Sequence, residues 1–303
     1  MATGDINHDG LPDVVAAAGA GGGPEVKVFD GKTNAVLTDF FAFAPTFSNG
    51  IFVAVGDVNG DAVPDLIIGA GPGGGPEVRI VDGTKLGMVQ ANGQISPAAL
   101  LADFYAFTPA FTGGVHVAAG DVNNDGRADI IIGAGAGGGP EVRVADAKKL
   151  AMIQANGQIS GSALLDDFFA YNPVFTGGVY VACLEVVDAF QGIIDRIHYI
   201  VTGAGAGGGP EVKVISGFVT LQANGEVAPV SLLSDFMAYA PSFTGGVTVA
   251  AADVNGDGHA DLITGPGPSG GPNVKVFNAY ISTSLLDNFM AFDPGFTGGI
   301  YVG

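Results

Sequence analysis

The chain of 303 residues contains no tryptophan, a single cysteine, and only 11 lysines and arginines against 30 aspartates and glutamates. One cysteine excludes an internal disulfide framework. The net charge of −19 disfavours nucleic-acid binding, because an acidic surface repels phosphate and attracts cations. No apolar run is long enough for a membrane-spanning helix. We therefore expect no nucleic-acid partner and no membrane span.

Glycine is unusually frequent, at 51 residues, and it is accompanied by 17 prolines. Glycine at this frequency weakens helix interiors, which argues against an all-helical protein. The apolar content of 48% argues equally against a disordered chain. Short apolar strands separated by tight glycine-rich turns satisfy both observations, so the composition predicts an all-β fold.

One sequence unit occurs five times. Its first block is Phe-Thr-Gly-Gly followed by an apolar run and an acidic residue, as in residues 111–121. A Gly-Gly-Pro-Glu-Val block and an Asp-Phe-Phe-Ala-Phe block follow it in each copy, with small variations. The acidic residues that end the first block are Asp5, Asp57, Asp121, Glu185 and Asp253, at steps of 52, 64, 64 and 68 residues.

Repeats of this length, made of short strands, predict a five-bladed β-propeller with about four antiparallel strands in each blade. In the third copy the expected strands are residues 115–119, 130–132, 141–144 and 168–171. The C-terminal residues 296–302 repeat the first strand of a unit, and no unit follows them. We expect this segment to complete the first blade and close the ring, so that residues 1–303 form one propeller domain.

Four loops after the first strands carry oxygen-bearing side chains at positions 1, 3, 5 and 9. They span residues 5–13, 57–65, 121–129 and 253–261. Alternating oxygen ligands in a tight loop are what calcium requires, and a backbone carbonyl at position 7 can add another ligand. The predicted ligands are Asp5, Asn7, Asp9, Leu11 and Asp13; Asp57, Asn59, Asp61, Val63 and Asp65; Asp121, Asn123, Asp125, Arg127 and Asp129; and Asp253, Asn255, Asp257, His259 and Asp261.

The loops differ from EF-hands, because Asp at position 9 replaces Glu at position 12. Metal-free Asx turns are the alternative interpretation of the same pattern. We favour calcium because three carboxylates in each loop would repel one another without a cation. Position 6 is glycine except at Ala62, where we expect strain. We expect about four calcium ions with a structural role. Sites that fill at millimolar calcium would place the protein outside the cytoplasm, in a secreted or cell-surface setting. The N-terminus itself has no signal-peptide pattern.

The fourth copy departs from this pattern. Residues 185–195 run Glu-Val-Val-Asp-Ala-Phe-Gln-Gly-Ile-Ile-Asp and are longer than the other loops. We expect a degenerate loop without metal here, folded over its blade.

These motifs resemble the FG-GAP repeat family, which forms the propellers of integrin alpha chains. The shared features are Phe-x-Gly-Gly, Asp-x-Asn-x-Asp-Gly-x-x-Asp, the apolar strand and a following Gly-Ala-Gly such as residues 133–135. The resemblance extends over essentially the whole chain. It implies calcium in the four loops and a role in adhesion or ligand binding. This chain has five repeat units, whereas integrin propellers have seven.

The chemistry of the remaining residues favours a binding protein over an enzyme. The four histidines are scattered over different copies, Cys183 lies in an expected strand, and we find no catalytic residues. We expect a module that binds an unidentified protein or glycan, as a monomer or as part of a larger surface protein. A carbohydrate-binding propeller is the alternative function, and a propeller hydrolase or lyase is the third hypothesis.

Two further patterns recur. Glu and Lys or Arg stand two residues apart in four copies, as at Glu77 and Arg79, which predicts acid–base pairs on one strand face. Three copies carry inserts at residues 90–94, 154–158 and 222–226, each with Asn-Gly at its centre. We expect these inserts to be small hairpins that pack over blade edges.

Overall fold

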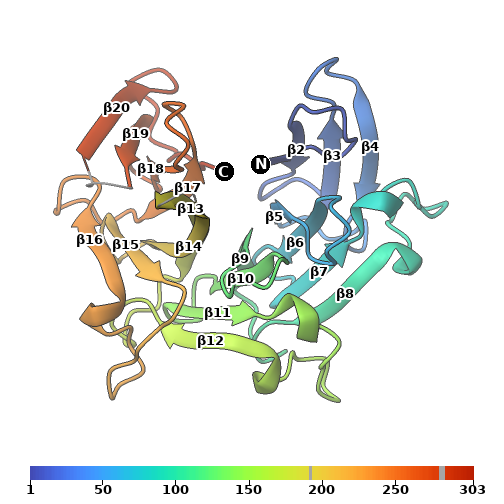
Figure 1. The fold of residues 1–303 in the computed structure, drawn as a ribbon, viewed down its shortest axis with the longest axis horizontal. Helices are drawn as coiled ribbons and strands as arrows, with labels where there is room; N and C mark the ends of the chain where they lie inside the picture. Colours follow the sequence, from blue (N-terminus) through green and yellow to red (C-terminus); the bar gives the residue numbers. More distant parts are fainter. Residues whose placement is uncertain (191–192, 280–283) are drawn as a thin grey trace. The chain divides into compact units, whose positions relative to one another are not determined.

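A computed structural model of the chain describes residues 1–190, 193–279 and 284–303. These residues form five antiparallel sheets of four strands each, in the order in which the strands occur in the sequence (Figure 1). The prediction of an all-β, five-bladed β-propeller is confirmed. Within the described residues, no helix is long and apolar enough to cross a membrane.

The strands of the five sheets are these. The first sheet contains β1 (Ala2–Gly4), β2 (Asp13–Ala17), β3 (Glu25–Phe29) and β4 (Val36–Phe41), and the second contains β5 (Ile51–Gly56), β6 (Asp65–Ala70), β7 (Glu77–Val81) and β8 (Leu100–Tyr105). The third contains β9 (Val115–Gly120), β10 (Asp129–Ala134), β11 (Glu141–Ala145) and β12 (Leu164–Phe169), and the fourth contains β13 (Val179–Phe190), β14 (Ile193–Ala204), β15 (Glu211–Ser216) and β16 (Leu232–Met237). The fifth contains β17 (Val247–Ala252), β18 (Asp261–Pro266), β19 (Asn273–Asn278) and β20 (Ser284–Met290). Short 3-10 turns, η1 (Gly83–Lys85), η2 (Pro97–Ala99), η3 (Ala147–Lys149), η4 (Gly161–Ala163) and η5 (Pro229–Ser231), flank the inserts.

The second strands of the second and third sheets are the most buried parts of those sheets. Every residue of β6 and β10 is buried, and Leu66, Ile67 and Ile68 have no exposed surface. Continuous apolar runs of this kind are expected where both faces of a strand are covered. Burial alternates along β3, where Val26 and Val28 are buried while Glu25 and Lys27 are half-buried.

The strand predictions for the third copy agree with the structure for its first three strands. The fourth strand begins at Leu164, four residues before the expected start, and ends at Phe169. Ala170 and Tyr171 were expected in this strand. They lie beyond it, where Ala170 donates its N–H to the Pro140 carbonyl.

One detail of the first sheet differs from the expectation. Its first strand is β1, and Ala2, Thr3 and Gly4 pair with Val15, Val14 and Asp13. Residues 296–302 lie outside the named strands. Residues 2–4 therefore occupy the position in the first sheet that we assigned to the C-terminal segment. These three residues, which directly precede the loop at Asp5, are enough to pair with β2.

The chain forms two compact units. One comprises Met1–Ala119, Gly126–Gly135 and Val144–Leu165, and the other comprises Gly120–Asp125, Ala136–Arg143 and Asp166–Gly303. Each has apolar clusters of its own, around Ile67 and Ile130 in the first and around Val201 and Val249 in the second. The assignment of residues 1–303 to one propeller domain stays a prediction.

The predicted acid–base pairs form on the third strands. Arg79 lies 2.8 Å from Glu77, and Lys27 lies 3.2 Å from Glu25. Two cations of the third strands, Arg79 and Lys213, also reach the preceding repeat. Arg79 donates to the Ala42 carbonyl at 2.8 Å, and the buried Lys213 donates to the Ala170 carbonyl at 3.0 Å. These cations therefore connect consecutive sheets, a role that the sequence pattern did not reveal.

Candidate calcium loops

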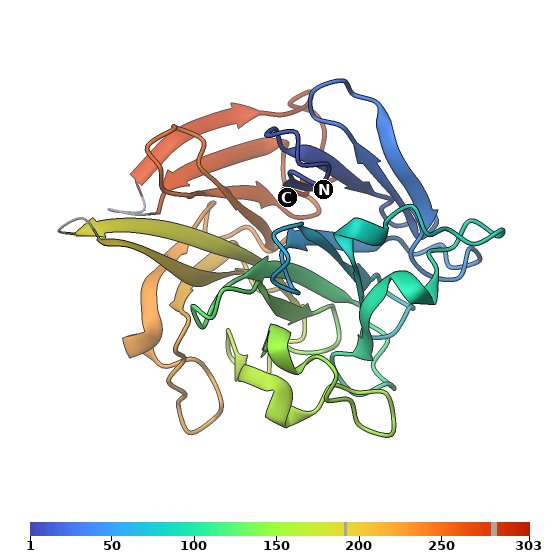
Figure 2. The ribbon, with the colours of Figure 1, turned by 45° about the vertical axis from the view of Figure 1, so that its right-hand side comes forward.

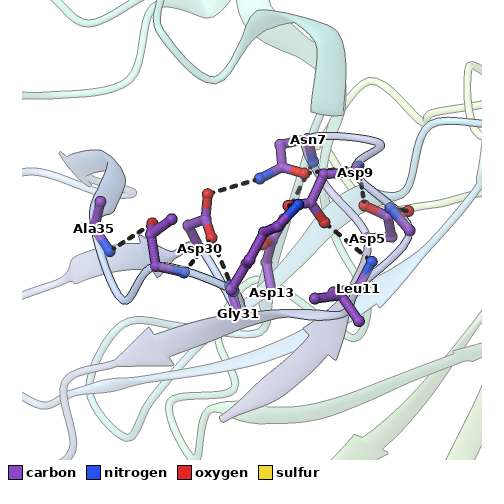
Figure 3. A network of polar contacts seen from close by, with 11 residues as sticks. Asp5, Asn7, Asp9, Leu11, Asp13, Asp30, Gly31 and Ala35 are labelled. Carbon is purple, nitrogen blue, oxygen red and sulfur yellow. Dashed lines mark hydrogen bonds and ion pairs between the residues drawn. The ribbon is translucent and has the colours of Figure 1, made fainter.

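The first loop, which joins β1 and β2, turns its side-chain oxygens towards its own backbone (Figure 3). Asp9 donates its N–H to Asp5 Oδ1 and to Asn7 Oδ1, both at 3.0 Å. Gly10 donates to Asp5 Oδ2, and Leu11 donates to Asp9 Oδ1, again at 3.0 Å. Successive Asx turns thus gather positions 1, 3 and 5 of the predicted ligand set in one turn of chain.

The acid at position 9 has a different role. Asp13 is fully buried at the start of β2. Its Oδ2 accepts N–H bonds from Ile6 at 2.9 Å and Asn7 at 3.1 Å, and its Oδ1 accepts one from Gly31 at 2.9 Å. Asp13 therefore ties the loop to the turn between β3 and β4, in addition to standing in the predicted ligand set.

The loops at residues 57–65 and 253–261 repeat this arrangement. The N–H at position 5 donates to the side chains at positions 1 and 3, at 3.2 and 2.8 Å in both loops. Val63 and His259, at position 7, donate their N–H groups to Asp61 and Asp257. Position 9 is buried in both loops and accepts N–H bonds from positions 2 and 3.

The loop at residues 121–129 divides between the two compact units, with residues 121–125 in one and residues 126–129 in the other. Asp125 donates its N–H to Asp121 Oδ1 at 2.8 Å, as in the other loops. Asp129 is buried and accepts an N–H bond from Ala147 at 3.0 Å. Asn123 Oδ1 is buried without a hydrogen-bond partner among the described residues. A buried oxygen in this state is the kind that a cation would satisfy.

The backbone of these loops needs left-handed residues at positions 4 and 6. At position 4, His8 and Asn124 have φ of 58° and 56°, and at position 6, Gly10 and Gly258 have φ of 88°. Ala62 takes the same conformation with φ of 70°, which confirms the expected strain in the second loop.

We predict that Ala62→Gly stabilises the protein. Glycine adopts positive φ without a Cβ penalty, so the free energy of unfolding should rise by about 1 kcal/mol. Urea unfolding of both proteins in the same buffer measures this difference. Gly258→Ala in the equivalent position is the matched control and should destabilise by a similar amount. Equal stability of wild type and Ala62→Gly would contradict the strain.

Burial dominates the electrostatics of Asp65, at position 9 of the second loop. It raises the pKa of Asp65 to about 6, although the N–H groups of Gly83, Val58 and Asn59 act in the opposite direction. A nearby cation would lower this pKa, because it favours the charged carboxylate.

The oxygen donors of the loops are of the types that calcium binds, but the structure brings these side chains only partly together. Each loop offers carboxylate, amide and carbonyl oxygens in the order that a calcium loop requires. In the described part of the chain, however, no three His, Cys, Asp or Glu side chains are grouped closely enough to hold a metal ion. In the second and fifth copies the Asn at position 3 also donates its amide N–H to the Asp at position 5. Calcium binding would therefore require the side chains at positions 3 and 5 to turn inward.

The fourth copy corrects our expectation of a loop at residues 185–195. Here β13 and β14 continue as one antiparallel ladder as far as the Phe190–Ile193 pair, and Figure 2 shows them as a long two-stranded ribbon. The β-branched residues Val186, Val187 and Ile197 favour this extension. Glu185 stands where the other copies have the first ligand, and it contacts Arg196 and lies 3.5 Å from His198 Nε2. The Arg196 guanidinium thus balances the charge of this acid.

The residues that could serve catalysis are dispersed. His116 packs edge-on against Phe52, with ring centroids 4.4 Å apart, and His198 faces Glu185. His8 and His259 lie in two different loops, and Cys183 lies on β13.

Comparisons with known families match the repeats. A model described as FG-GAP-like repeat matches residues 5–68, and a model described as FG-GAP repeat matches residues 49–90, 113–146 and 245–274. The matched segments include all four predicted calcium loops. A search of curated protein sequences found no match.

A search of solved structures found similar chains at low sequence identity. A protein of unknown function from Bacteroides caccae is 11% identical, with a TM-score of 0.47 over 93% of this chain and 74% of that one. The exotype rhamnogalacturonan lyase YesX is 12% identical, with a TM-score of 0.39 over 84% of this chain and 47% of that one. U3-55K is 11% identical, with a TM-score of 0.43 over 95% and 80% of the two chains.

Proposed function

We propose that this chain, a protein built of FG-GAP repeats, is a calcium-stabilised propeller module that binds a protein partner outside the cell. The observation that carries the proposal is the shared hydrogen-bond frame of the loops at residues 5–13, 57–65 and 253–261. In each, backbone N–H groups orient the side chains at positions 1, 3 and 5 around one turn.

Charge supports the same conclusion. The four loops contain 12 of the 30 acidic residues, and four bound calcium ions would bring the net charge from −19 to −11. The buried carboxyl at position 9 and the buried Asn123 oxygen add groups that a cation would stabilise. A structural role for calcium at millimolar concentration suits an extracellular setting.

Calcium titration of the full chain tests the proposal. After removal of metal with a chelator and dialysis, calorimetry should detect about four calcium ions per chain. Asp61→Asn keeps the side-chain acceptor for Val63 N–H but removes one charge from the second loop, so it should lower the stoichiometry by one. Asp293→Asn, an exposed acid outside the loops, is the matched control. Titration without any heat of binding would refute the calcium assignment.

The partner class is tested separately. A glycan array with the calcium-loaded protein distinguishes protein binding from the carbohydrate-binding alternative. Saturable binding to one class of glycan would replace the protein partner that we propose.

A further inference from the structure

The three inserts bind the outer strand of the preceding sheet in one common way. Phe41, the last residue of β4, donates its N–H to the Gly93 carbonyl at 2.8 Å and accepts an N–H bond from Ile95 at 3.0 Å. We call the insert segments 90–95, 154–159 and 222–227 straps. The other two straps make the same pair of bonds to Tyr105, at the end of β8, and to Phe169, at the end of β12. Each strap runs parallel to the strand that it covers.

Side chains strengthen these contacts. The strap glycines, Gly93, Gly157 and Gly225, have φ near 82°, and a Cβ on each would lie within 3.1 or 3.2 Å of the ring that it covers. The residue two positions later is Ile95, Ile159 or Val227, and each of these is at most 2% exposed. Recognition of the strand end therefore uses two backbone hydrogen bonds, a glycine against a flat side chain, and one buried β-branched residue.

Among the residues that the structure describes, no strap covers the fourth outer strand, β16. A strap would come from the connection between β19 and β20, which has five residues, whereas the connection between β7 and β8 has 18. Met237 occupies the place of Phe41, because Ala238 donates to the Pro210 carbonyl as Ala42 does to Pro24. Its side chain is 47% exposed, and Leu233 on the same strand face is 52% exposed. Among the described residues, no backbone bond reaches the outward N–H and carbonyl of Met237.

We propose that the outer edge of β16, centred on Met237, binds an extended segment of a partner protein in which Ile or Val follows a glycine by two positions. The three straps show which chemistry covers this edge in the sister sheets. Strand addition at an exposed edge is a common mode of peptide recognition. The flexible methionine adapts to a ligand more readily than an aromatic ring. The net charge of −19 favours basic residues beside the recognised segment.

This inference rests on the proposed protein-binding role but not on calcium. The probe is a fluorescent peptide of residues 86–96, extended by two lysines, added to the full chain. We expect saturable binding by fluorescence anisotropy. Met237→Pro removes the outward N–H while leaving the β15–β16 ladder intact, and it should weaken binding about tenfold. Val230→Ser, an exposed apolar position just before β16, is the control and should bind as wild type does.

A second variant guards against misfolding of Met237→Pro. Replacing residues 279–283 with residues 82–99 supplies a strap within the chain and should abolish peptide binding while the melting temperature stays equal or rises. Failure of the peptide to bind at about 1 mM, or equal binding by Met237→Pro and wild type, would overturn the proposal. Self-association of the wild type that Met237→Pro abolishes would assign the edge to a second copy instead. Calcium titration of the same variants tests the calcium assignment separately, so that a failure of the β16 edge to bind the peptide can be told apart from a failure of the calcium assignment.

Discussion

Chelation of calcium is expected to lower the melting temperature of the full chain by about 10 °C. A site with a Kd of about 0.1 mM contributes roughly 1.4 kcal/mol at about 1 mM calcium, because binding to the folded state alone shifts the unfolding equilibrium. Four such sites together contribute about 5 to 6 kcal/mol, and in a domain of this size each kcal/mol corresponds to roughly 2 °C. Differential scanning fluorimetry in calcium and in excess chelator measures the shift.

Two controls make this result specific. Magnesium should restore the melting temperature only in part, since it prefers strict octahedral geometry and retains its waters. A variant in which Asp5, Asp57, Asp121 and Asp253 are all changed to Asn should melt at one temperature in calcium and in chelator. Identical melting curves for the wild type in the two buffers would show that the loops hold together through their Asx turns alone.

Asp65→Ala is expected to destabilise the protein by about 3 to 5 kcal/mol even when no calcium is present. The fully buried carboxylate accepts N–H bonds from Val58, Asn59 and Gly83, and alanine would leave all three donors without this acceptor. The cost of burying the charge offsets part of this loss, as the raised pKa of Asp65 indicates. Urea unfolding in chelator measures the effect.

Comparison with Asp61→Asn separates the two roles of loop acids. Asp61 is exposed, and asparagine retains the oxygen that accepts the Val63 N–H bond. This variant loses only the exposed Asn59 Nδ2 bond to Asp61 Oδ2, so it should stay within about 0.5 kcal/mol of wild type in chelator and lose further stability in calcium. If Asp65→Ala were as stable as wild type in chelator, position 9 would act through the ion alone and the hydrogen-bond account would be wrong.

The sequence predicted the repeated architecture closely because its signals are local. Alternation of apolar residues, as in β3, and the glycine-rich turns specify each strand within a few residues. The Asx pattern likewise specifies which side chains belong to one loop. The strand boundaries at Leu164 and the identity of the first strand, β1, were missed, since both depend on which neighbouring segment reaches a sheet first.

The fourth repeat shows where local signals mislead. Loss of the ligand pattern at residues 185–195 indicated a loop, yet the ladder of β13 and β14 continues. The decisive contacts join Glu185 to Arg196 and His198, which stand 11 and 13 residues away on the opposite strand. No sequence pattern within either strand predicts that these two strands pair so far along their length.

By itself, then, the amino-acid order determined five similar units, their strands, and four oxygen-rich turns, because these depend on residues within about ten positions of one another. The tertiary structure alone decided which sheet edges are covered and which cations join neighbouring sheets. The strap on Phe41 comes from residues more than 50 positions away, and Lys213 reaches a carbonyl 43 positions away. Such contacts form only when packing of the sheets brings distant backbone groups together, and backbone groups carry no sequence signal of their own.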